Sequence, residues 1–210
     1  MPIHPEFPYP LYLVISKNDC KELNWLKVAE EAILGGVDII QLREKDISYQ
    51  DYLAKSIALK KLTDKYQIPL IINDSASISN EIDCWGVHVG LSDVQPIEIA
   101  SQYGHKMHIG WSLEYLNQLN NEQIVATHHL GVSPIFKTPT KTNTVTPWGI
   151  QGIENLKEKT QKPLIAIGGM NRTNAKESFN AGANSIAVVS AICGSTDPRK
   201  EAQILKELLK

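Results

Sequence analysis

The chain is poor in the features that mark disulfide-rich, zinc-binding or membrane proteins. Its three cysteines, Cys20, Cys84 and Cys193, match no zinc or CxxC spacing, and an odd number cannot form a closed set of disulfides. Residues 1–10 include four prolines but no apolar segment of signal-peptide length. No stretch approaches the roughly 20 apolar residues of a membrane span. These absences predict reduced thiols and a cytoplasmic protein with no membrane partner.

An excess of charge of one sign is also missing. Lys and Arg number 21 against 23 Asp and Glu, which gives a net charge of −2, and no long run of like charges occurs. We therefore expect no nucleic-acid partner, although a local basic pocket remains compatible with this balance. The nucleotide-binding patterns GxGxxG and GxxxxGK[ST] are absent as well.

Short apolar runs instead alternate with longer amphipathic stretches along the whole chain. Helical spacing of apolar residues is seen over residues 23–34, 48–66, 97–103, 113–119 and 174–180, and further helices are predicted from about residues 150 and 197. The runs that predict strands, rich in Val and Ile, are residues 11–16, 39–43, 70–73, 86–90, 107–112, 129–136, 164–169 and 185–192.

Eight strand–helix pairs with nearly continuous apolar strands are typical of a parallel sheet that is covered on both faces. Right-handed crossovers close eight such units into a barrel, and 210 residues lie near the lower limit for this fold. The sequence predicts an α/β fold, a single (β/α)₈ TIM barrel spanning residues 1–210, with residues 1–10 as an N-terminal extension. An open doubly wound sheet is the alternative. A weak repeat, GGVDIIQL, AGANSIAV and DCWGVHVG, marks three points where a helix end enters a strand.

Polar residues gather where these apolar strands end. In a βα barrel this end of the strands carries the functional site. Arginine and lysine side chains there suit phosphate oxygens, carboxylates suit Mg²⁺, and a glycine pair lets a backbone approach a phosphate closely. The residues concerned are Gln41, Arg43, Lys45, Asn73, Asp74, His88, Asp93, Ser112, Thr138, Thr140, Lys141, Gly168, Gly169 and Ser190.

Each of these residues also has a plain structural interpretation. Arg43 and Lys45 can form a solvated charge cluster, Asp74 or Asp93 can cap a helix, and His88 can be a core histidine. Their joint placement at successive strand ends favours a site with one metal-assisted, basic anion position and a second position built from backbone amides. Other histidines are expected to take no part: His108 has no partner at ligand spacing, and the pair at residues 128–129 opens a strand away from the functional rim.

Seven short motifs in this order resemble thiamin phosphate synthases, a family that also includes related thiazole tautomerases. The resemblance covers nearly the whole chain, from about residue 11 to residue 209. Its motifs are QLREK (residues 41–45), ND (73–74), HVGxxD (88–93), GWS (110–112), SPIFKTPTK (133–141), IGG (167–169) and VVSAI (188–192).

The resemblance implies a transferase that condenses 4-amino-2-methyl-5-hydroxymethylpyrimidine pyrophosphate with 4-methyl-5-(2-hydroxyethyl)thiazole phosphate. It implies that the pyrimidine C–O bond breaks first and that the thiazole nitrogen then captures the cation. It implies Mg²⁺ as the cofactor, bound by Asp74 and Asp93. The implied contacts are Gln41 and His88 to the aminopyrimidine; Arg43, Lys45, Asn73, Ser112 and Lys141 to the pyrophosphate; and Thr138, Thr140, Gly168, Gly169, Val189 and Ser190 to the thiazole phosphate.

Three positions depart from the family pattern: Ser133 replaces Gly, Lys137 replaces Pro and Leu91 replaces Gln. Ser133 and Leu91 bear on substrate packing, whereas Lys137 either adds a cation or faces solvent. The polar loop 137–147 is a hypothetical lid over the site.

Three alternative functions remain. A thiazole tautomerase would use a histidine where this chain has Glu114, another phosphate-binding barrel would need no Mg²⁺, and a non-catalytic barrel would bind phosphate ligands without turnover. A homo-oligomeric state is left open.

Overall fold

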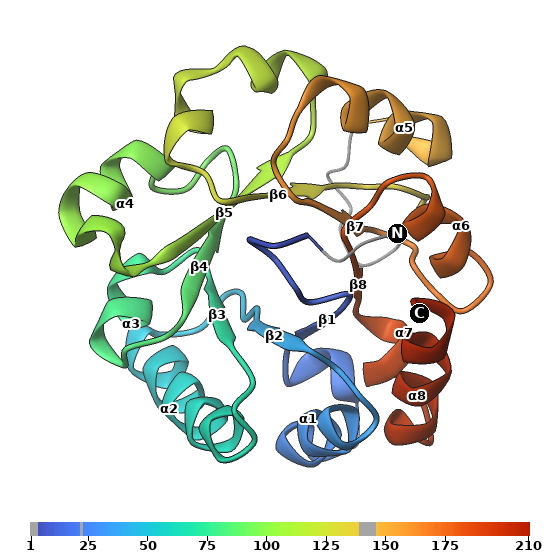
Figure 1. Cartoon of the computed structure of the whole chain (residues 1–210). Helices are drawn as coiled ribbons and strands as arrows, with labels where there is room; N and C mark the ends of the chain where they lie inside the picture. The colour runs from blue at the N-terminus through green and yellow to red at the C-terminus, as the bar shows by residue number, and fades with distance from the viewer. Residues whose placement is uncertain (1–3, 22, 139–145) are drawn as a thin grey trace.

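The computed structural model describes residues 4–21, 23–138 and 146–210, and it contains a closed barrel of eight parallel strands. The strands follow one another around the barrel in chain order, and helices surround them (Figure 1). This confirms the predicted (β/α)₈ fold and excludes the open doubly wound sheet. The strands are β1 (Leu11–Ile15), β2 (Ile39–Leu42), β3 (Leu70–Asn73), β4 (Gly86–Val89), β5 (His108–Leu113), β6 (His129–Val132), β7 (Leu164–Ile167) and β8 (Ser185–Val188).

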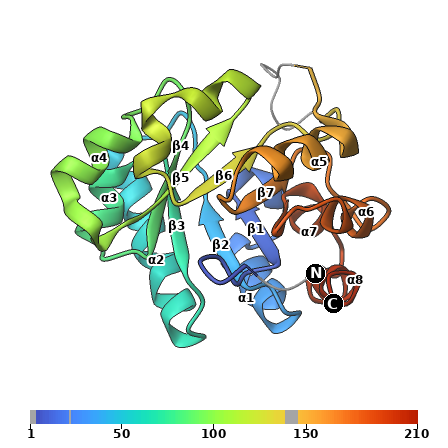
Figure 2. The ribbon, with the colours of Figure 1, turned by 45° about the horizontal axis from the view of Figure 1, so that its top comes forward.

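The helices form the outer layer, which is visible in the tilted view of Figure 2. They are α1 (Trp25–Leu34), α2 (Tyr49–Lys65), α3 (Ala76–Glu81), α4 (Pro96–Tyr103), α5 (Gly149–Lys159), α6 (Ala175–Asn180), α7 (Ser190–Cys193) and α8 (Pro198–Leu208). Short 3₁₀ helices are η1 (Asn18–Cys20), η2 (Gly104–Lys106), η3 (Leu116–Asn120) and η4 (Glu122–Ala126). In the described part of the chain, no helix is both long enough and apolar enough to span a membrane.

Capping residues in the sequence explain where several helices begin. The Asn24 side chain accepts the backbone N–H groups of residues 26 and 27 at the start of α1, and Ser48 accepts that of Asp51 at the start of α2. Asp197 caps α8, and Pro198 occupies its first turn, where the missing N–H costs nothing.

The weak sequence repeat has a structural basis at the start of two strands. Asp38 Oδ2 accepts the backbone N–H of Leu11 at 2.8 Å, and Asn184 Oδ1 accepts that of Leu164 at 2.9 Å. Each polar residue precedes its own strand and holds the first residue of a neighbouring strand. The two repeat copies therefore fix the register where β2 meets β1 and where β8 meets β7.

Three predicted elements differ from the structure by three or more residues at one end. The predicted helix over residues 113–119 is a 3₁₀ helix, η3, that begins only at Leu116. Leu113 belongs to β5, and the Gln118 side chain holds the turn between them by accepting the N–H groups of Glu114 and Tyr115. The predicted strand over 129–136 ends at Val132, since Pro134 has no N–H to continue the ladder. The predicted strand over 185–192 ends at Val188, and α7 follows it.

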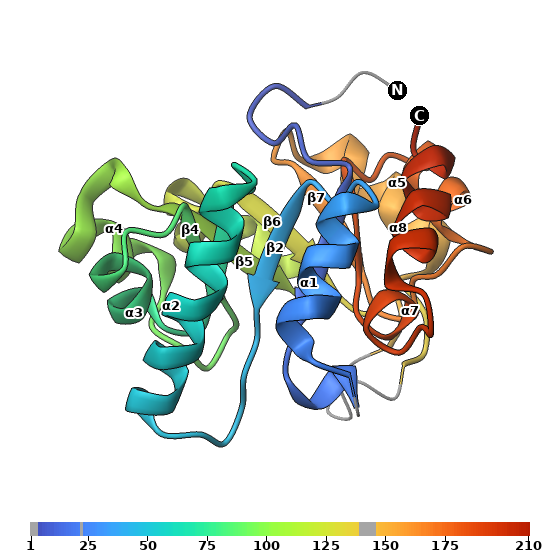
Figure 3. The same cartoon turned by 90° about the horizontal axis from the view of Figure 1, so that it is seen from below.

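Residues 4–10 lie against the end of the barrel at which the strands begin (Figure 3, dark blue). Phe7 is fully buried there and packs against the rings of Tyr9, Tyr12, Trp85 and His129. The apolar part of the barrel interior consists of Phe7, Tyr12, Val14, Ile39, Ile71, Ile165 and Ala187, with Tyr9 and Trp85 packed against them. The segment therefore closes one mouth of the barrel and leaves the other for the site.

Candidate active site

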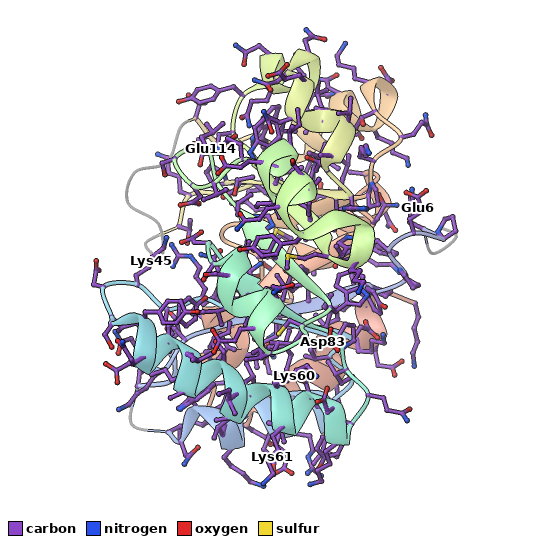
Figure 4. All side chains as sticks on the ribbon, turned by 90° about the vertical axis from the view of Figure 1, so that its left-hand side faces the viewer. Glu6, Lys45, Lys60, Lys61, Asp83 and Glu114 are labelled. Atoms are coloured by element: carbon purple, nitrogen blue, oxygen red, sulfur yellow. The ribbon has the colours of Figure 1, made fainter. Side chains whose placement is uncertain are left out.

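The residues predicted from strand ends surround one cavity of about 230 Å³ at the mouth where the strands finish. In Figure 4 the labelled Lys45 and Glu114 lie at this end of the molecule, whereas Glu6 lies at the opposite end. Thr140 and Lys141, together with most of the predicted lid, lie outside the described residues. The predicted residues that line the cavity are Gln41, Arg43, Lys45, Asn73, Asp74, His88, Asp93, Ser112, Thr138, Gly168, Gly169, Val189 and Ser190.

The segment after β2 presents two cations to the cavity because the residue between them faces inward to the protein. Glu44 is only 6% exposed; it accepts the Lys17 backbone N–H at 2.8 Å and pairs with Lys55 at 2.8 Å. Arg43 and Lys45 on either side line the cavity. The interpretation of residues 43–45 as a freely solvated charge cluster is therefore wrong, because the central carboxylate is buried and anchors the segment.

The two predicted metal ligands lie side by side. Asp74 accepts a hydrogen bond from Lys45, and its backbone adopts a positive φ of 64° directly after β3. The Asp93 carboxylate accepts the Gly90 N–H at 2.7 Å. Burial raises the pKa of Asp93, and the hydrogen bond and charge of Asp74 raise it further, although the Gly90 N–H lowers it.

Two adjacent carboxylates on a rim that carries Arg43 and Lys45 fit Mg²⁺, which typically uses one or two carboxylates together with substrate phosphates. Because the charge of Asp74 disfavours the charged form of Asp93, a divalent cation between the two carboxylates would relieve this repulsion.

The middle of the cavity is lined by hydrogen-bonding side chains from β2, β4 and β5. Gln41 is buried and donates its amide N–H to the Tyr12 hydroxyl at 2.7 Å, so its carbonyl oxygen remains available as an acceptor. His88 Nε2 lies 3.1 Å from Ser112 Oγ. A ligand in this part of the cavity therefore meets an amide, an imidazole and a hydroxyl at defined positions.

The glycine pair after β7 forms the opposite wall. Gly168 and Gly169 have φ values of +98° and +69°, and a Cβ on either would lie within 3 Å of Pro134 or Phe136. The backbone N–H of Phe136 donates to Gly168 O at 3.0 Å, which fixes the segment after β6 against this turn. The wall continues into the first residue of α7, Ser190, at a helix start where backbone N–H groups lack intrahelical partners.

The departures from the family pattern are placed as follows. Ser133 lines the cavity. Leu91 is 42% exposed, and Lys137 is exposed, as the interpretation of a solvent-facing lysine expected. None of the three replaces a predicted metal or phosphate ligand.

Sequence reasoning missed several cavity residues. His129 was expected to lie away from the site, and this is wrong, because its ring extends inward from β6 to line the cavity and contact His88. His108 was expected to lack a partner, yet its Nε2 lies 3.0 Å from His129 Nδ1. Tyr12 and Asp19 also line the cavity. The alternation of inward positions along β1, β5 and β6 is the signal that could have found Tyr12, His108 and His129.

Known proteins are similar to this chain over almost its whole length. The family model described as thiamine monophosphate synthase matches residues 11–192. A thiamine-phosphate synthase of Albidiferax ferrireducens is 40% identical over 199 residues, covering 95% of this chain and 91% of that protein. A thiamine-phosphate synthase of Vibrio parahaemolyticus is 39% identical, covering 96% and 98% of the two chains.

A solved structure agrees with these sequence relatives. The thiamine phosphate pyrophosphorylase of Pyrococcus furiosus superposes with a TM-score of 0.85 and 28% identity, covering 96% of this chain and 95% of that one. The family model, the relatives and the fold thus point the same way. The chain belongs to the thiamine monophosphate synthase family.

Proposed function

We propose that this chain condenses 4-amino-2-methyl-5-hydroxymethylpyrimidine pyrophosphate with 4-methyl-5-(2-hydroxyethyl)thiazole phosphate to give thiamin phosphate and pyrophosphate, the reaction of EC 2.5.1.3. The observation that carries the proposal is the division of one cavity into two anion-binding walls. Arg43, Lys45 and the two aspartates line one wall, and Gly168 and Gly169 line the other. A reaction that joins a pyrophosphate ester to a phosphate ester needs such a pair of positions.

The pyrophosphate is assigned to the wall formed after β2, β3 and β4. Arg43 binds its oxygens as a planar fork, and Lys45 contributes a point charge. Asn73 and Ser112 supply hydrogen bonds, and Lys141 is expected to add a third cation. Asp74 and Asp93 would hold Mg²⁺, which would neutralise charge on the leaving pyrophosphate. The cofactor assignment rests on the paired carboxylates described above.

The aminopyrimidine lies between the two walls, where Gln41 and His88 contact it. The Gln41 carbonyl oxygen, left available by the bond from its amide to Tyr12, accepts from the exocyclic amino group. When the C–O bond breaks, its electron pair leaves with the pyrophosphate oxygen, and the surrounding cations stabilise that charge where it develops. The resulting pyrimidine cation stays in a cavity whose lining includes the apolar side chains of Val14 and Ile165 beside the ring of His129.

The thiazole phosphate is assigned to Gly168, Gly169, Val189 and Ser190, with Thr138 and Thr140 beside the thiazole. Backbone N–H groups near a helix start suit a phosphate dianion. Binding here holds the thiazole nitrogen toward the pyrimidine, so that it captures the cation before water does. The partners are these two small molecules, and the buried, free cysteines favour a cytoplasmic setting.

The test is turnover of the two substrates with and without Mg²⁺, using Asp93→Asn and a matched control, Asp83→Asn. Asp83 is an exposed aspartate outside the cavity, labelled in Figure 4. We expect Asp93→Asn to lower turnover roughly 100-fold or more because it removes a ligand for the metal, and we expect the control to match the parent protein. Binding of thiazole phosphate without any product would instead support a tautomerase or a non-catalytic barrel.

A further inference from the structure

A line of hydrogen-bonded imidazoles crosses the barrel interior beneath the site. It starts at Ser112 Oγ, which lies 3.1 Å from His88 Nε2. His88 Nδ1 lies 3.4 Å from His129 Nε2, and His129 Nδ1 lies 3.0 Å from His108 Nε2. Three rings from β4, β6 and β5 thus connect a hydroxyl in the cavity to the far side of the barrel.

Glycines on the strands create the space for these rings. Gly110 on β5 lies in register between His88 on β4 and His129 on β6. A Cβ on Gly110 would lie 2.2 Å from His129 Nε2 and 2.5 Å from His88 Nδ1, and one on Gly131 would lie 2.7 Å from His88 Cε1. A barrel interior is ordinarily filled by branched apolar side chains. In this half of the interior, imidazole rings take the place of those side chains.

The far end of the line is covered by aromatic rings. His108 stacks on Trp85 with ring centroids 3.9 Å apart, and Phe7 lies 5.8 Å from His108 and 4.9 Å from His129. This is the end of the molecule at which Glu6 is labelled in Figure 4, opposite Lys45 and Glu114. The chain of bonds therefore has one end in the cavity and its other end at His108, a half-buried ring that packs against Trp85 and Phe7.

Burial keeps the inner rings neutral. It lowers the pKa of His108 to about 3, helped by the nearby charges of His128 and Lys162, and it lowers the pKa of His129 well below its usual value. A neutral imidazole offers one N–H donor and one acceptor nitrogen. Both nitrogens of His129 have imidazole partners. Because a neutral ring has one donor and one acceptor nitrogen, His129 must donate one of these hydrogen bonds and accept the other. The hydrogen bonds along the line therefore all point the same way.

The ligand at the rim selects the direction. An anionic oxygen held by Arg43 and Lys45 accepts a hydrogen bond from the Ser112 hydroxyl, so the Ser112 oxygen accepts from His88. His88 then accepts from His129, which accepts from His108. We propose that His129 and His108 are positioning residues that hold His88 as its Nε2–H form, with Ser112 donating to the pyrophosphate. This inference rests on the proposed placement of pyrophosphate at Ser112.

The direct test is nitrogen NMR of the histidine rings, which distinguishes the two neutral forms without requiring turnover. The probe is inorganic pyrophosphate with Mg²⁺, added to the full-length protein. We expect His88, His129 and His108 each to be protonated at Nε2 in its presence. Protonation of His88 at Nδ1 under these conditions would overturn the proposal, whether or not the protein makes thiamin phosphate.

A pair of variants at His129 separates hydrogen bonding from packing. His129→Phe retains a ring of similar shape and removes both bonds, whereas His129→Gln retains a nitrogen that donates and an oxygen that accepts. We expect His129→Phe to convert His88 to a mixture of neutral forms and to lower kcat roughly tenfold, more than it changes KM. His129→Gln should restore the single form of His88 and most of kcat.

A third variant acts at a distance from the substrates. His108→Phe leaves the contact between His129 and His88 in place but removes the partner of His129 Nδ1, so His129 is no longer required to donate through Nε2. We expect the His88 signals to change as in His129→Phe, with a smaller loss of kcat. Unchanged His88 signals in both phenylalanine variants, or equal kcat in His129→Phe and the parent, would show that the line of imidazoles only fills space. An absence of turnover in the parent protein would refute the proposed function, while the NMR result would still decide the state of the line.

Discussion

Acid should destabilise this protein through its buried histidines, and His108→Phe isolates the effect. The pKa of His108 in the folded protein is about 3, against about 6.5 in an unfolded chain. Below pH 6.5 the unfolded chain therefore binds a proton that the folded protein does not. Stability from this group is present above pH 6.5 and is lost progressively as the pH falls from 6.5 toward 3.

The magnitude follows from the two pKa values. Between pH 7 and pH 5 the unfolded form gains about 2 kcal/mol from protonation of one such histidine, while the folded form gains almost nothing. This is a large fraction of the 5–15 kcal/mol that stabilises an ordinary domain. The loss is due to the titrating ring alone, so a phenylalanine at the same position removes it.

The assay is urea unfolding of the parent protein and of His108→Phe at pH 7 and pH 5. Carboxylates contribute equally to both proteins, so the difference between the two pH-dependent losses reports His108. We expect the variant to lose about 2 kcal/mol less than the parent over this range. Trp85→Phe is the packing control: it alters the ring stacked on His108 and should lower stability equally at both pH values. Equal losses in the parent and His108→Phe would refute the inference that His108 is neutral in the folded protein.

Three further predictions concern packing and backbone. Phe7→Ala should lower the unfolding free energy by about 3–5 kcal/mol, because Phe7 is fully buried. The control Glu6→Ala, at an exposed neighbour, should change it very little. Similar losses in the two variants, measured by urea unfolding, would contradict the closure of the barrel by this segment. Gly110→Ala should destabilise the fold by about 1–3 kcal/mol through its contacts with two imidazoles, and an unchanged melting temperature would count against those contacts. Gly168→Ala should raise KM for thiazole phosphate several-fold more than KM for the pyrimidine substrate, since φ is +98° there and the added Cβ meets Pro134; equal effects on both KM values would argue against a phosphate position at this turn.

The fold was predictable because its signals are local and repeated. Apolar runs marked all eight strands, and the two repeat copies containing Asp38 and Asn184 fall at equivalent strand entrances. The boundaries that could not be predicted depend on longer-range contacts. The end of β5 depends on hydrogen bonds from the Gln118 side chain to the backbone of residues 112–115. The spacing of apolar residues in the sequence does not indicate such a side-chain contact.

The rim of the site was predictable because polar residues are conspicuous on apolar strands. Arg43, Asp74 and Asp93 come at strand ends or just after them. Packing of the barrel core places few demands on the residue type at these positions. The interior histidines were not, because a histidine near a strand start is compatible with many environments. Their roles depend on which residues of each strand point into the barrel and on which strands are neighbours. The contact between His108 and His129 can be recognised only when the order of β4, β5 and β6 in the barrel is known.

The glycines that accommodate the imidazoles also constrain how this sequence can change. With His88 and His129 in place, position 110 has no room for a larger residue. A side chain there becomes acceptable only after one of the rings has been replaced by something smaller. Conversely, a chain with a larger residue at position 110 cannot acquire both histidines until that residue has shrunk to glycine. The three positions are therefore coupled in evolution, and substitutions at them are expected to succeed in one order and fail in the reverse order.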